Sequence, residues 1–378
     1  MVAGEASGDL LGSRLMDALR ELVPHVRFVG IGGPRMQAAG MDIWFPAEKL
    51  AVRGYLEVAR HLAGILNIRR QVRRRLLADP PAAFIGIDAP DFNLGLELSL
   101  KSHGIPTVHY VCPAIWMWRR KRLRKIRRAA DRVLALFPFE VPLCRQAGVD
   151  AVFVGHPLTD VLAQVPARAA AREQLKVPPL GTIVALLPGS RQSELQYMAD
   201  LFIQTAALIH ARAPQAKFLV PLATRETRAM FEAALYRNEA AQLPLTVLFG
   251  HAQEALSAAD VALVASGTAT LEATLLGTPL VITYKMPAAS HWWLKGKGYL
   301  PYYGLPNILA GEFVVPELIQ DDATPLNLSQ ALLNLLADEP VRSRLKRRFS
   351  ALGASLQRGA ARRAAEAVLP MLAHDGHG

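Results

Sequence analysis

Residues 85–93 read IGIDAPDFN, an apolar run that leads directly into two acids. The apolar residues 83–87 predict a buried strand, and Asp88 stands where this strand ends. In open α/β sheets, ligands bind beyond the carboxyl ends of the strands, so Asp88 lies where a catalytic carboxylate is expected. Asp91 or Asn93 can instead cap the following helix, a role for which Asp88 comes too early.

Short apolar runs of this kind recur along the chain and alternate with helical patterns, which indicates parallel α/β units. They lie at residues 27–31, 83–87, 107–111, 133–137 and 151–154, and then at 182–187, 218–221, 246–249, 261–264 and 280–284. The polar stretch 162–180 between the two sets is expected to be an interdomain linker. We therefore predict two Rossmann-like α/β domains at residues 1–161 and 181–341, with helices at about 342–378 packing back on the first.

The composition is that of a globular protein. The 378 residues are 51% hydrophobic and 20% charged, enough to bury real cores. The sequence has no apolar run of about 18 residues and does not open on a charged region followed by an apolar one, so neither a transmembrane helix nor a signal peptide is expected. Cys112 and Cys144 lack metal-ligand spacing, and we expect a cytosolic location.

The formal net charge of +11 favours anionic partners, such as nucleic acid, acidic lipid headgroups or phosphorylated substrates. Much of the excess is local, because eight cations lie between Arg119 and Arg128.

A glycine-containing turn opens the chain, where residues 4–9 read GEASGD. Gly4 and Gly8 let the backbone approach a ligand, and the N–H groups of the next helix point at it. Glu5 and Asp9 would repel a bare phosphate and suit sugar hydroxyls, so we expect this loop on the acceptor side. The alternative is a tight turn in which Ser7 or Asp9 caps the helix.

A loop in the second half suits a phosphate. Residues 186–191 read LLPGSR, a strand followed by a glycine-containing loop and a helix start. The backbone N–H groups of Gly189 and Ser190, together with the guanidinium of Arg191, would cradle a diphosphate. The alternative is a helix cap by Ser190 beside a solvated Arg191.

Residues 266–272 read SGTATLE and form a second loop of this type. Ser266, Gly267 and Thr268 crowd a helix start, which is compatible with an anion, and Glu272 can accept both hydroxyls of a ribose. A capping box is the alternative for Glu272. The sequence contains no Asp-x-Asp pair for a metal–diphosphate bridge and no His/Cys cluster, so we expect a mechanism without metal or cofactor.

An ordered set of strings between Gly4 and Gly311 resembles the lipid-A-disaccharide synthase family. The strings are GEASGD at Gly4, FVGIGGPRM at Phe28, GIDAPDFN at Gly86, HYVCPAIWMWRRKR at His109, LLPGSR at Leu186, SGTATLE at Ser266 and LPNILAG at Leu305. The resemblance implies a metal-independent, inverting glycosyltransferase of the GT-B fold, with two Rossmann-like domains facing across a cleft. It also implies transfer from UDP-2,3-diacylglucosamine to 2,3-diacylglucosamine 1-phosphate, giving the β-1,6-linked lipid A disaccharide 1-phosphate and UDP.

Roles for single residues follow from this resemblance and from the positions above. We predict that Asp88 is the general base, with Asp91 as its rival, and that Glu5 positions the acceptor or serves as base from the neighbouring loop. Asn307, in the LPNILAG string, joins Arg191 and the other loop residues in the expected nucleotide-sugar site.

The resemblance further implies a peripheral enzyme on the cytoplasmic face of the inner membrane. Trp116 and Trp118 precede the cations Arg119, Arg120, Lys121 and Arg122, a combination that suits an anionic membrane interface. An apolar stripe of Leu56, Val58, Leu62, Ile65 and Leu66 could hold acyl chains or enter the bilayer. The alternatives are a solvated cationic helix face with tryptophans in the core, and an ordinary core-facing helix.

Two other classes of protein stay open at this point. A sugar-nucleotide epimerase of the same architecture would need several acids and histidines around the sugar, and the GIDAPDFN pattern argues against it. A nucleic-acid-binding protein is suggested by charge alone, without a recognised module, so we expect no nucleic-acid partner. A homodimer is left open.

Overall fold

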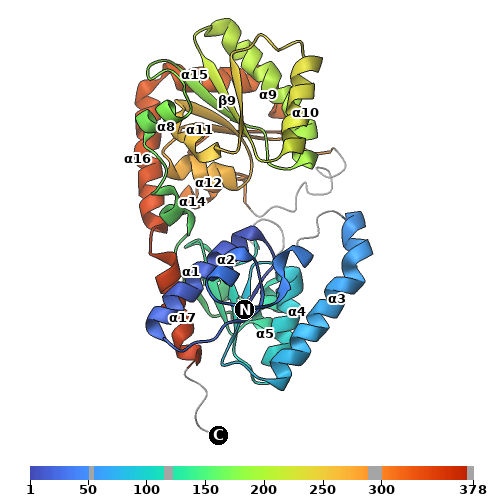
Figure 1. Cartoon of the computed structure of the whole chain (residues 1–378). Helices are drawn as coiled ribbons and strands as arrows, with labels where there is room; N and C mark the ends of the chain where they lie inside the picture. Colours follow the sequence, from blue (N-terminus) through green and yellow to red (C-terminus); the bar gives the residue numbers. More distant parts are fainter. Residues whose placement is uncertain (51–54, 115–121, 288–299, 373–378) are drawn as a thin grey trace. The chain divides into compact units, whose positions relative to one another are not determined.

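The computed structural model describes residues 1–50, 55–114, 122–287 and 300–372, and for residues 55–61 it describes the backbone (Figure 1). The chain forms two compact units. The first comprises Met1–Pro157 and Leu356–Gly378, and the second comprises Leu158–Ser355. Among the described residues, no helix is both long and apolar enough to cross a membrane.

The first unit is built on a seven-stranded parallel sheet in the order β3-β2-β1-β4-β5-β6-β7. Its strands are β1 Val2–Ala3, β2 Val29–Gly32, β3 Asp42–Pro46, β4 Phe84–Ile87, β5 Thr107–Tyr110, β6 Arg132–Ala135 and β7 Ala151–Phe153. The winding direction reverses between β1 and β4. In doubly wound sheets this reversal opens a crevice at the carboxyl ends of the two strands, where ligands bind.

Helices cover this sheet because each presents an apolar side to it. They are α1 Ala6–Leu22, α2 Pro34–Ala38, α3 Tyr55–Ala78, α4 Pro90–Lys101, α5 Arg122–Ala129, α6 Glu140–Gln146 and α17 Ala360–Leu372, with a short 3-10 turn η1 at Ala47–Lys49. In α1, Leu15 and Leu19 stand four residues apart and are buried, and this helix packs against α17 (Figure 1). The C-terminal helix therefore completes the first unit.

The second unit contains a six-stranded parallel sheet in the order β10-β9-β8-β11-β12-β13. Its strands are β8 Ile183–Leu187, β9 Lys217–Leu222, β10 Leu245–Phe249, β11 Val261–Ala265, β12 Leu280–Tyr284 and β13 Glu317–Ile319. The reversal here falls between β8 and β11. Both strands are buried along their whole length, as expected of central parallel strands.

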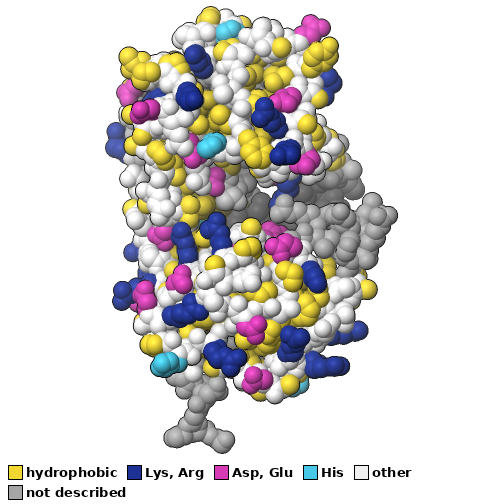
Figure 2. Space-filling view, in the orientation of Figure 1, with side chains coloured by type: hydrophobic (Ala, Val, Ile, Leu, Met, Phe, Trp, Pro, Cys, Tyr) yellow, Lys and Arg dark blue, Asp and Glu magenta, His cyan; other side chains and the backbone are white. Residues whose placement is uncertain are grey.

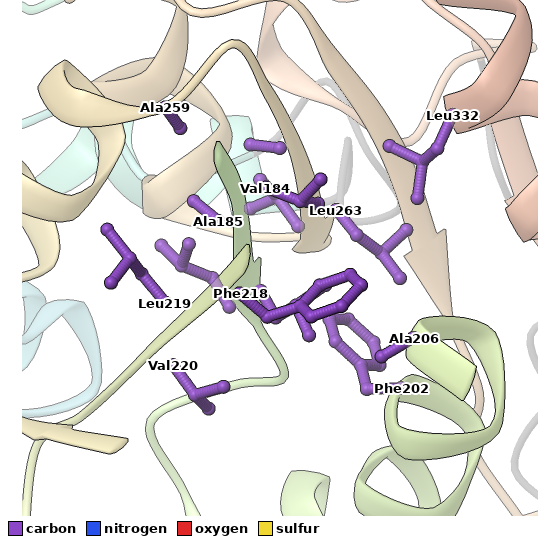
Figure 3. Close-up of a cluster of buried hydrophobic side chains, with 14 of the residues drawn as sticks. Val184, Ala185, Phe202, Ala206, Phe218, Leu219, Val220, Ala259, Leu263 and Leu332 are labelled. Carbon is purple, nitrogen blue, oxygen red and sulfur yellow. The ribbon is translucent and has the colours of Figure 1, made fainter. Parts of the chain in front are cut away.

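The helices of the second unit enclose one large apolar core. They are α7 Leu158–Leu162, α8 Arg168–Gln174, α9 Gln192–Arg212, α10 Arg225–Arg237, α11 Ala252–Ala258, α12 Thr268–Leu275, α14 Leu305–Ala310, α15 Pro325–Ala337 and α16 Glu339–Leu356, with a 3-10 turn η2 at Gln320–Asp322. Figure 3 shows part of this core, with Phe202 of α9 and Phe218 of β9 among the side chains between helix and sheet.

The stretch 162–180, expected as a linker, folds onto the second unit instead of forming an open connection. Arg172 of α8 is almost fully buried and donates to the carbonyl oxygens of Ala258 at 2.9 Å and Pro179 at 2.9 Å. It also pairs with Asp260 at 3.0 Å. A single buried guanidinium thus ties this stretch to the end of α11 and to Asp260, which directly precedes β11.

The return to the first unit lies at Leu356, later than the expected position of about 342. The reason is that α16 buries Leu345 and Phe349 in the core of the second unit. Near the return point, the His156 N–H donates to the Leu356 carbonyl oxygen at 3.0 Å, so the outgoing and incoming segments of the chain are hydrogen-bonded to one another.

Candidate functional site

The carboxyl ends of β1 and β4 bring two predicted acids to the same edge of the first sheet. Ala3 and Ile87 are register partners, so Glu5 and Asp88 follow neighbouring strands. A Cβ on Gly4 would lie 3.1 Å from the Cβ of Ala89, which shows how closely the two loops pack. Glu5 is exposed at the start of α1.

The backbone at Asp88 is unusual. Asp88 and Ala89 have φ angles of 51° and 42°, in the left-handed region that residues other than glycine seldom adopt. Hydrogen bonds hold this turn in place: the Asp88 N–H donates to the Tyr110 carbonyl oxygen at 2.8 Å, and the Asn93 side-chain amide donates to the Asp88 carbonyl oxygen at 2.8 Å. Strain maintained in this way is concentrated at functional sites.

The surroundings of Asp88 favour the protonated acid. Burial raises the pKa of the half-buried Asp88 carboxyl, and the negative charge of Glu5 raises it further. His109 and a hydrogen bond from the Ala89 N–H lower it, but the net shift is upward. A raised pKa makes the ionised carboxylate a stronger proton acceptor, which suits a general base only while the group remains ionised.

A buried Glu–His pair, which was not predicted from the sequence, lies beneath this loop. His109 of β5 and Glu97 of α4 are fully buried, and His109 Nδ1 lies 2.7 Å from Glu97 Oε1. A Cβ on Gly86, the register partner of His109, would collide with Glu97 Oε1. The sequence signals were a histidine inside an apolar strand and an acid four residues after Asn93 on the same side of a helix.

Asp9, expected in the acceptor loop, holds the protein's own backbone. It is 4% exposed and accepts from the N–H groups of Gly33, Arg35 and Met36 at 2.8, 2.9 and 3.0 Å. Both carboxylate oxygens are occupied, so Asp9 stabilises the start of α2. The remaining loop residues differ in exposure: Ser7 is exposed, whereas Gly4 and Gly8 are buried.

Asp91, the rival base, is engaged elsewhere. Its side chain is 85% exposed, and its Oδ1 lies 2.6 Å from Arg122 Nη2. Trp116, Trp118, Arg119, Arg120 and Lys121 fall outside the described residues.

The residues of the apolar stripe on α3 differ in their exposure to solvent. The side chains of Leu56 and Val58 lie outside the described residues. Leu62 is 47% exposed, whereas Leu66 is half-buried and Ile65 packs against a core that includes Val72 and Leu76. On the face of the molecule drawn in Figure 2, basic side chains are interspersed with acidic ones.

In the second unit, the loop after β8 already holds a carboxylate. Glu194 Oε2 accepts from the N–H groups of Ser190 and Arg191 at 3.2 and 3.4 Å, and Glu194 Oε1 lies 3.6 Å from Arg191 Nη1. Gly189 has a φ of 118°, and a Cβ there would lie 2.9 Å from the Glu194 Cβ. The loop therefore presents anion-binding N–H groups, and the Arg191 side chain is 66% exposed.

The loop after β11 stands beside this one, because Val264 and Leu187 are register partners. Gly267 and Thr268 are exposed, and Ser266 Oγ donates to the Tyr303 carbonyl oxygen at 3.1 Å. Glu272 is half-buried in α12. Burial raises the pKa of the Glu272 carboxyl, and a hydrogen bond with the Gln253 side chain opposes this shift.

The side chain of Asn307 forms hydrogen bonds within the second unit. It is fully buried, and its amide group donates to the Val315 carbonyl oxygen at 2.9 Å and to Glu317 Oε1 at 2.8 Å. Its carbonyl oxygen accepts from the N–H groups of Val314 and Val315. Asn307 thus shapes the segment 304–317 and has no polar atom left for a ligand in this arrangement.

A sequence model of the family described as "Lipid-A-disaccharide synthetase" matches residues 1–369. The chain belongs to this family. Two similar relatives are lipid-A-disaccharide synthases, from Methylobacillus flagellatus at 54% identity over 372 residues and from Dechloromonas aromatica at 53% over 373 residues, each match covering 98% of both chains. Membership in the lipid-A-disaccharide synthetase family makes the chain a glycosyltransferase that forms the lipid A disaccharide.

Solved structures similar to this lipid-A-disaccharide synthetase family member place it among GT-B proteins. MurG of Acinetobacter baumannii matches with a TM-score of 0.58 and 17% identity over 98% of both chains. A putative UDP-N-acetylglucosamine 2-epimerase from Listeria monocytogenes matches with a TM-score of 0.65 and 12% identity, covering 97% of this chain and 93% of the other. At such identities the likeness concerns the fold alone, so it gives the epimerase alternative no support.

Proposed function

We propose that the chain transfers the sugar of UDP-2,3-diacylglucosamine to 2,3-diacylglucosamine 1-phosphate, forming a β-1,6-linked disaccharide 1-phosphate and UDP. The observation that carries this proposal is the identity of 54% to a lipid-A-disaccharide synthase along 98% of both chains. The second unit binds the donor and the first unit binds the acceptor. In each sheet the binding groups come from the two loops at the strand reversal. These loops follow β1 and β4 in the first unit, and β8 and β11 in the second.

The donor's nucleotide lies over the loops after β8 and β11. Its diphosphate accepts hydrogen bonds from the N–H groups of Ser190 and Arg191, which donate to Glu194 in this structure. The Arg191 guanidinium forms an ion pair with the diphosphate. The Glu272 carboxylate accepts hydrogen bonds from the two ribose hydroxyls. The negative charge that develops on the leaving diphosphate is stabilised by Arg191 and by helix N–H groups, so the transfer needs no metal ion.

Asp88 removes the proton from the acceptor's primary hydroxyl as its oxygen attacks the anomeric carbon. The bond from that carbon to the diphosphate oxygen breaks in the same step, UDP departs with the electron pair, and the proton stays on Asp88. One displacement inverts the carbon and requires a single base and no covalent intermediate. The raised pKa of Asp88 and the strained turn that holds it support this role.

The enzyme acts at the cytoplasmic face of the inner membrane, where both lipid substrates are presented. Cations at the start of α5 attract the anionic surface, and the exposed Leu62 of α3 lies at the boundary with lipid.

A UDP-release assay with purified protein, both lipid substrates and excess EDTA tests this function. UDP should appear together with a disaccharide 1-phosphate of the summed acyl content, and omission of either lipid should abolish both products. UDP released from the donor alone, with an altered monosaccharide, would instead identify an epimerase. Activity lost with EDTA and restored by a divalent cation would contradict the metal-free step.

A further inference from the structure

Three polar atoms around Gly86 are buried and unpartnered. They are Asn93 Oδ1, Glu97 Oε2 and His109 Nε2, and none has a hydrogen-bond partner among the described residues. Leaving a buried polar atom unsatisfied costs about 1–3 kcal/mol. An apolar trio of similar size would avoid this cost, so the cluster is not accounted for by packing.

The cluster is connected to the Asp88 turn through the backbone. Asn93, one turn before Glu97 on α4, donates to the carbonyl oxygens of Asp88 and Ile87 at 2.8 and 3.4 Å. His109 directly precedes Tyr110, whose carbonyl oxygen accepts the Asp88 N–H. β4, which Asp88 directly follows, pairs in register with β5, and Gly86 lies opposite His109.

Two arrangements leave the buried pair net neutral: a carboxylic acid with a neutral imidazole, and a carboxylate with an imidazolium. Glu97 and His109 share a short contact in a fully buried site, where a lone carboxylate or a lone imidazolium would be strongly disfavoured. A carboxylate facing an imidazolium is net neutral, and it places a positive charge on the strand next to Asp88. This charge opposes the negative charge of Glu5, which stands on the other side of Asp88 at the start of α1.

We propose that Glu97 and His109 form a positioning pair for Asp88, in which Glu97 fixes His109 as an imidazolium and His109 stabilises the Asp88 carboxylate. This inference rests on the proposed role of Asp88 as general base. Burial and Glu5 both favour the protonated acid, which cannot accept the acceptor's proton. The buried cation opposes both effects and favours the ionised carboxylate.

The groups that act on Asp88 come from three packed elements: Glu5 from α1, His109 from β5 and, through His109, Glu97 from α4. The nearby Asp91 is held by Arg122 in an exposed ion pair. Removing the imidazolium raises the pKa of Asp88, because a factor that lowered it is lost. The acid limb of the pH profile of kcat/KM must then move to higher pH.

The test compares the pH profiles of kcat/KM for His109→Gln and Glu97→Gln with that of the unmodified enzyme. Both variants should lose about tenfold more activity at pH 6 than at pH 9, because each removes the cation. His103→Gln, an exposed histidine just after α4, is the matched control and should leave the profile unchanged. A loss that is uniform across pH would overturn the proposal and leave the pair a packing element.

Two further measurements keep the proposal falsifiable. If the buried variants fail to fold, nitrogen NMR of the unmodified protein with labelled histidine tests the charge of the His109 ring directly. The His109 resonance is recognised as the one that shifts in Asp88→Asn. Protonation of both ring nitrogens at pH 7 is expected, and a neutral ring would overturn the proposal. If Asp88→Asn itself retains near-normal turnover, the base assignment fails and the positioning role fails with it. If Asp88→Asn is inactive but the pH profiles of His109→Gln and Glu97→Gln are unshifted, Asp88 remains the base and only the positioning role of the pair is excluded.

Discussion

At the scale of single residues, the donor loop binds a carboxylate of its own chain. Glu194 accepts from the N–H groups of Ser190 and Arg191 and approaches the Arg191 guanidinium, which are the groups assigned to the diphosphate. The two anions cannot occupy these N–H groups together. If the diphosphate binds there as proposed, the glutamate must be displaced, and this displacement weakens the observed affinity.

We expect Glu194→Gln to bind UDP about threefold to tenfold more tightly, because a neutral amide competes less well for charge-assisted contacts. Arg191→Ala should have the opposite effect, losing about 1.5–3 kcal/mol of binding. Calorimetric titration with UDP measures both. Glu226→Gln, in the first turn of α10, is the control and should not change the affinity. Weaker binding by Glu194→Gln would mean that the carboxylate supports the bound loop.

A second residue-scale effect concerns stability. Burial lowers the pKa of His156 from 6.5 to about 4, and the side chain is 8% exposed. The folded state therefore binds fewer protons than the unfolded state between these pH values. The stabilisation is complete above about pH 6.5 and is lost as the pH falls toward 4, by about 3 kcal/mol in total.

Denaturant unfolding between pH 7.5 and 4.5 measures this loss. His156→Gln should show a smaller fall in the free energy of unfolding than the unmodified protein, whereas the exposed His25→Gln should follow the unmodified protein. Parallel curves for all three proteins would exclude His156 as the source.

The roles of Asp9, Asn307 and the Glu97–His109 pair could not be predicted from local sequence. Asp9 meets N–H groups 24 to 27 residues away, and Glu97 meets His109 across 12 residues, so their partners are set by tertiary packing. For Asp88 the apolar run predicted the position, directly after β4 at the carboxyl edge of the sheet, whereas its role as base stays a prediction.

At the scale of elements, continuous apolar runs predicted the central strands well. The runs 83–87, 182–187 and 261–264 correspond to β4, β8 and β11, which are buried on both sides. The edge strands β3 and β13 were missed. Their residues are only partly buried, so their sequences DIWFP and ELI carry no continuous apolar signal.

Another element-scale feature is the junction where the chain leaves and re-enters the first unit. Gly155 has a φ of 95°, and a Cβ there would lie 2.7 Å from the Arg358 Cβ and 2.9 Å from the Leu356 carbonyl oxygen. Glycine is required both for the backbone conformation and for the close approach of the returning segment.

Gly155→Ala should lower the free energy of unfolding by about 2–4 kcal/mol, combining backbone strain with the steric conflict. Gly104→Ala is the matched control, since Gly104 has a φ of 82° but nothing within 4 Å of an added Cβ. Denaturant unfolding of both variants separates the two contributions. Equal losses would show that the close approach to Leu356 and Arg358 contributes nothing.

At the scale of the whole molecule, the order of motifs along the chain predicted the fold class that the family and the similar structures show. Each sheet reverses its winding where the predicted loops lie, so the topology explains the placement of those loops. The boundary at Leu356 was harder to predict, because α16 and α17 read alike as amphipathic helices and only packing divides them between the units.

The net charge of +11 predicts membrane association that weakens with salt. Each cation near an anionic bilayer contributes about 1 kcal/mol. Sedimentation with vesicles of phosphatidylglycerol and phosphatidylethanolamine should fall steeply between low and high salt, and vesicles of phosphatidylcholine alone should bind far less. Binding that is independent of salt and lipid charge would assign the attachment to apolar contacts such as that of Leu62.

The proposed mechanism requires that Asp88 takes the proton in a single inverting step. The decisive measurement is the kcat of Asp88→Asn. Asp91→Asn, in the first turn of α4, is the matched control, and UDP affinity is the check on folding. Asp88→Asn should bind UDP normally while kcat falls by about 10²–10⁴-fold, and Asp91→Asn should stay close to the unmodified enzyme. Near-normal turnover by Asp88→Asn, together with loss of activity in Asp91→Asn or Glu5→Gln, would show that Asp88 is not the base and would assign that role to the residue whose loss abolishes activity.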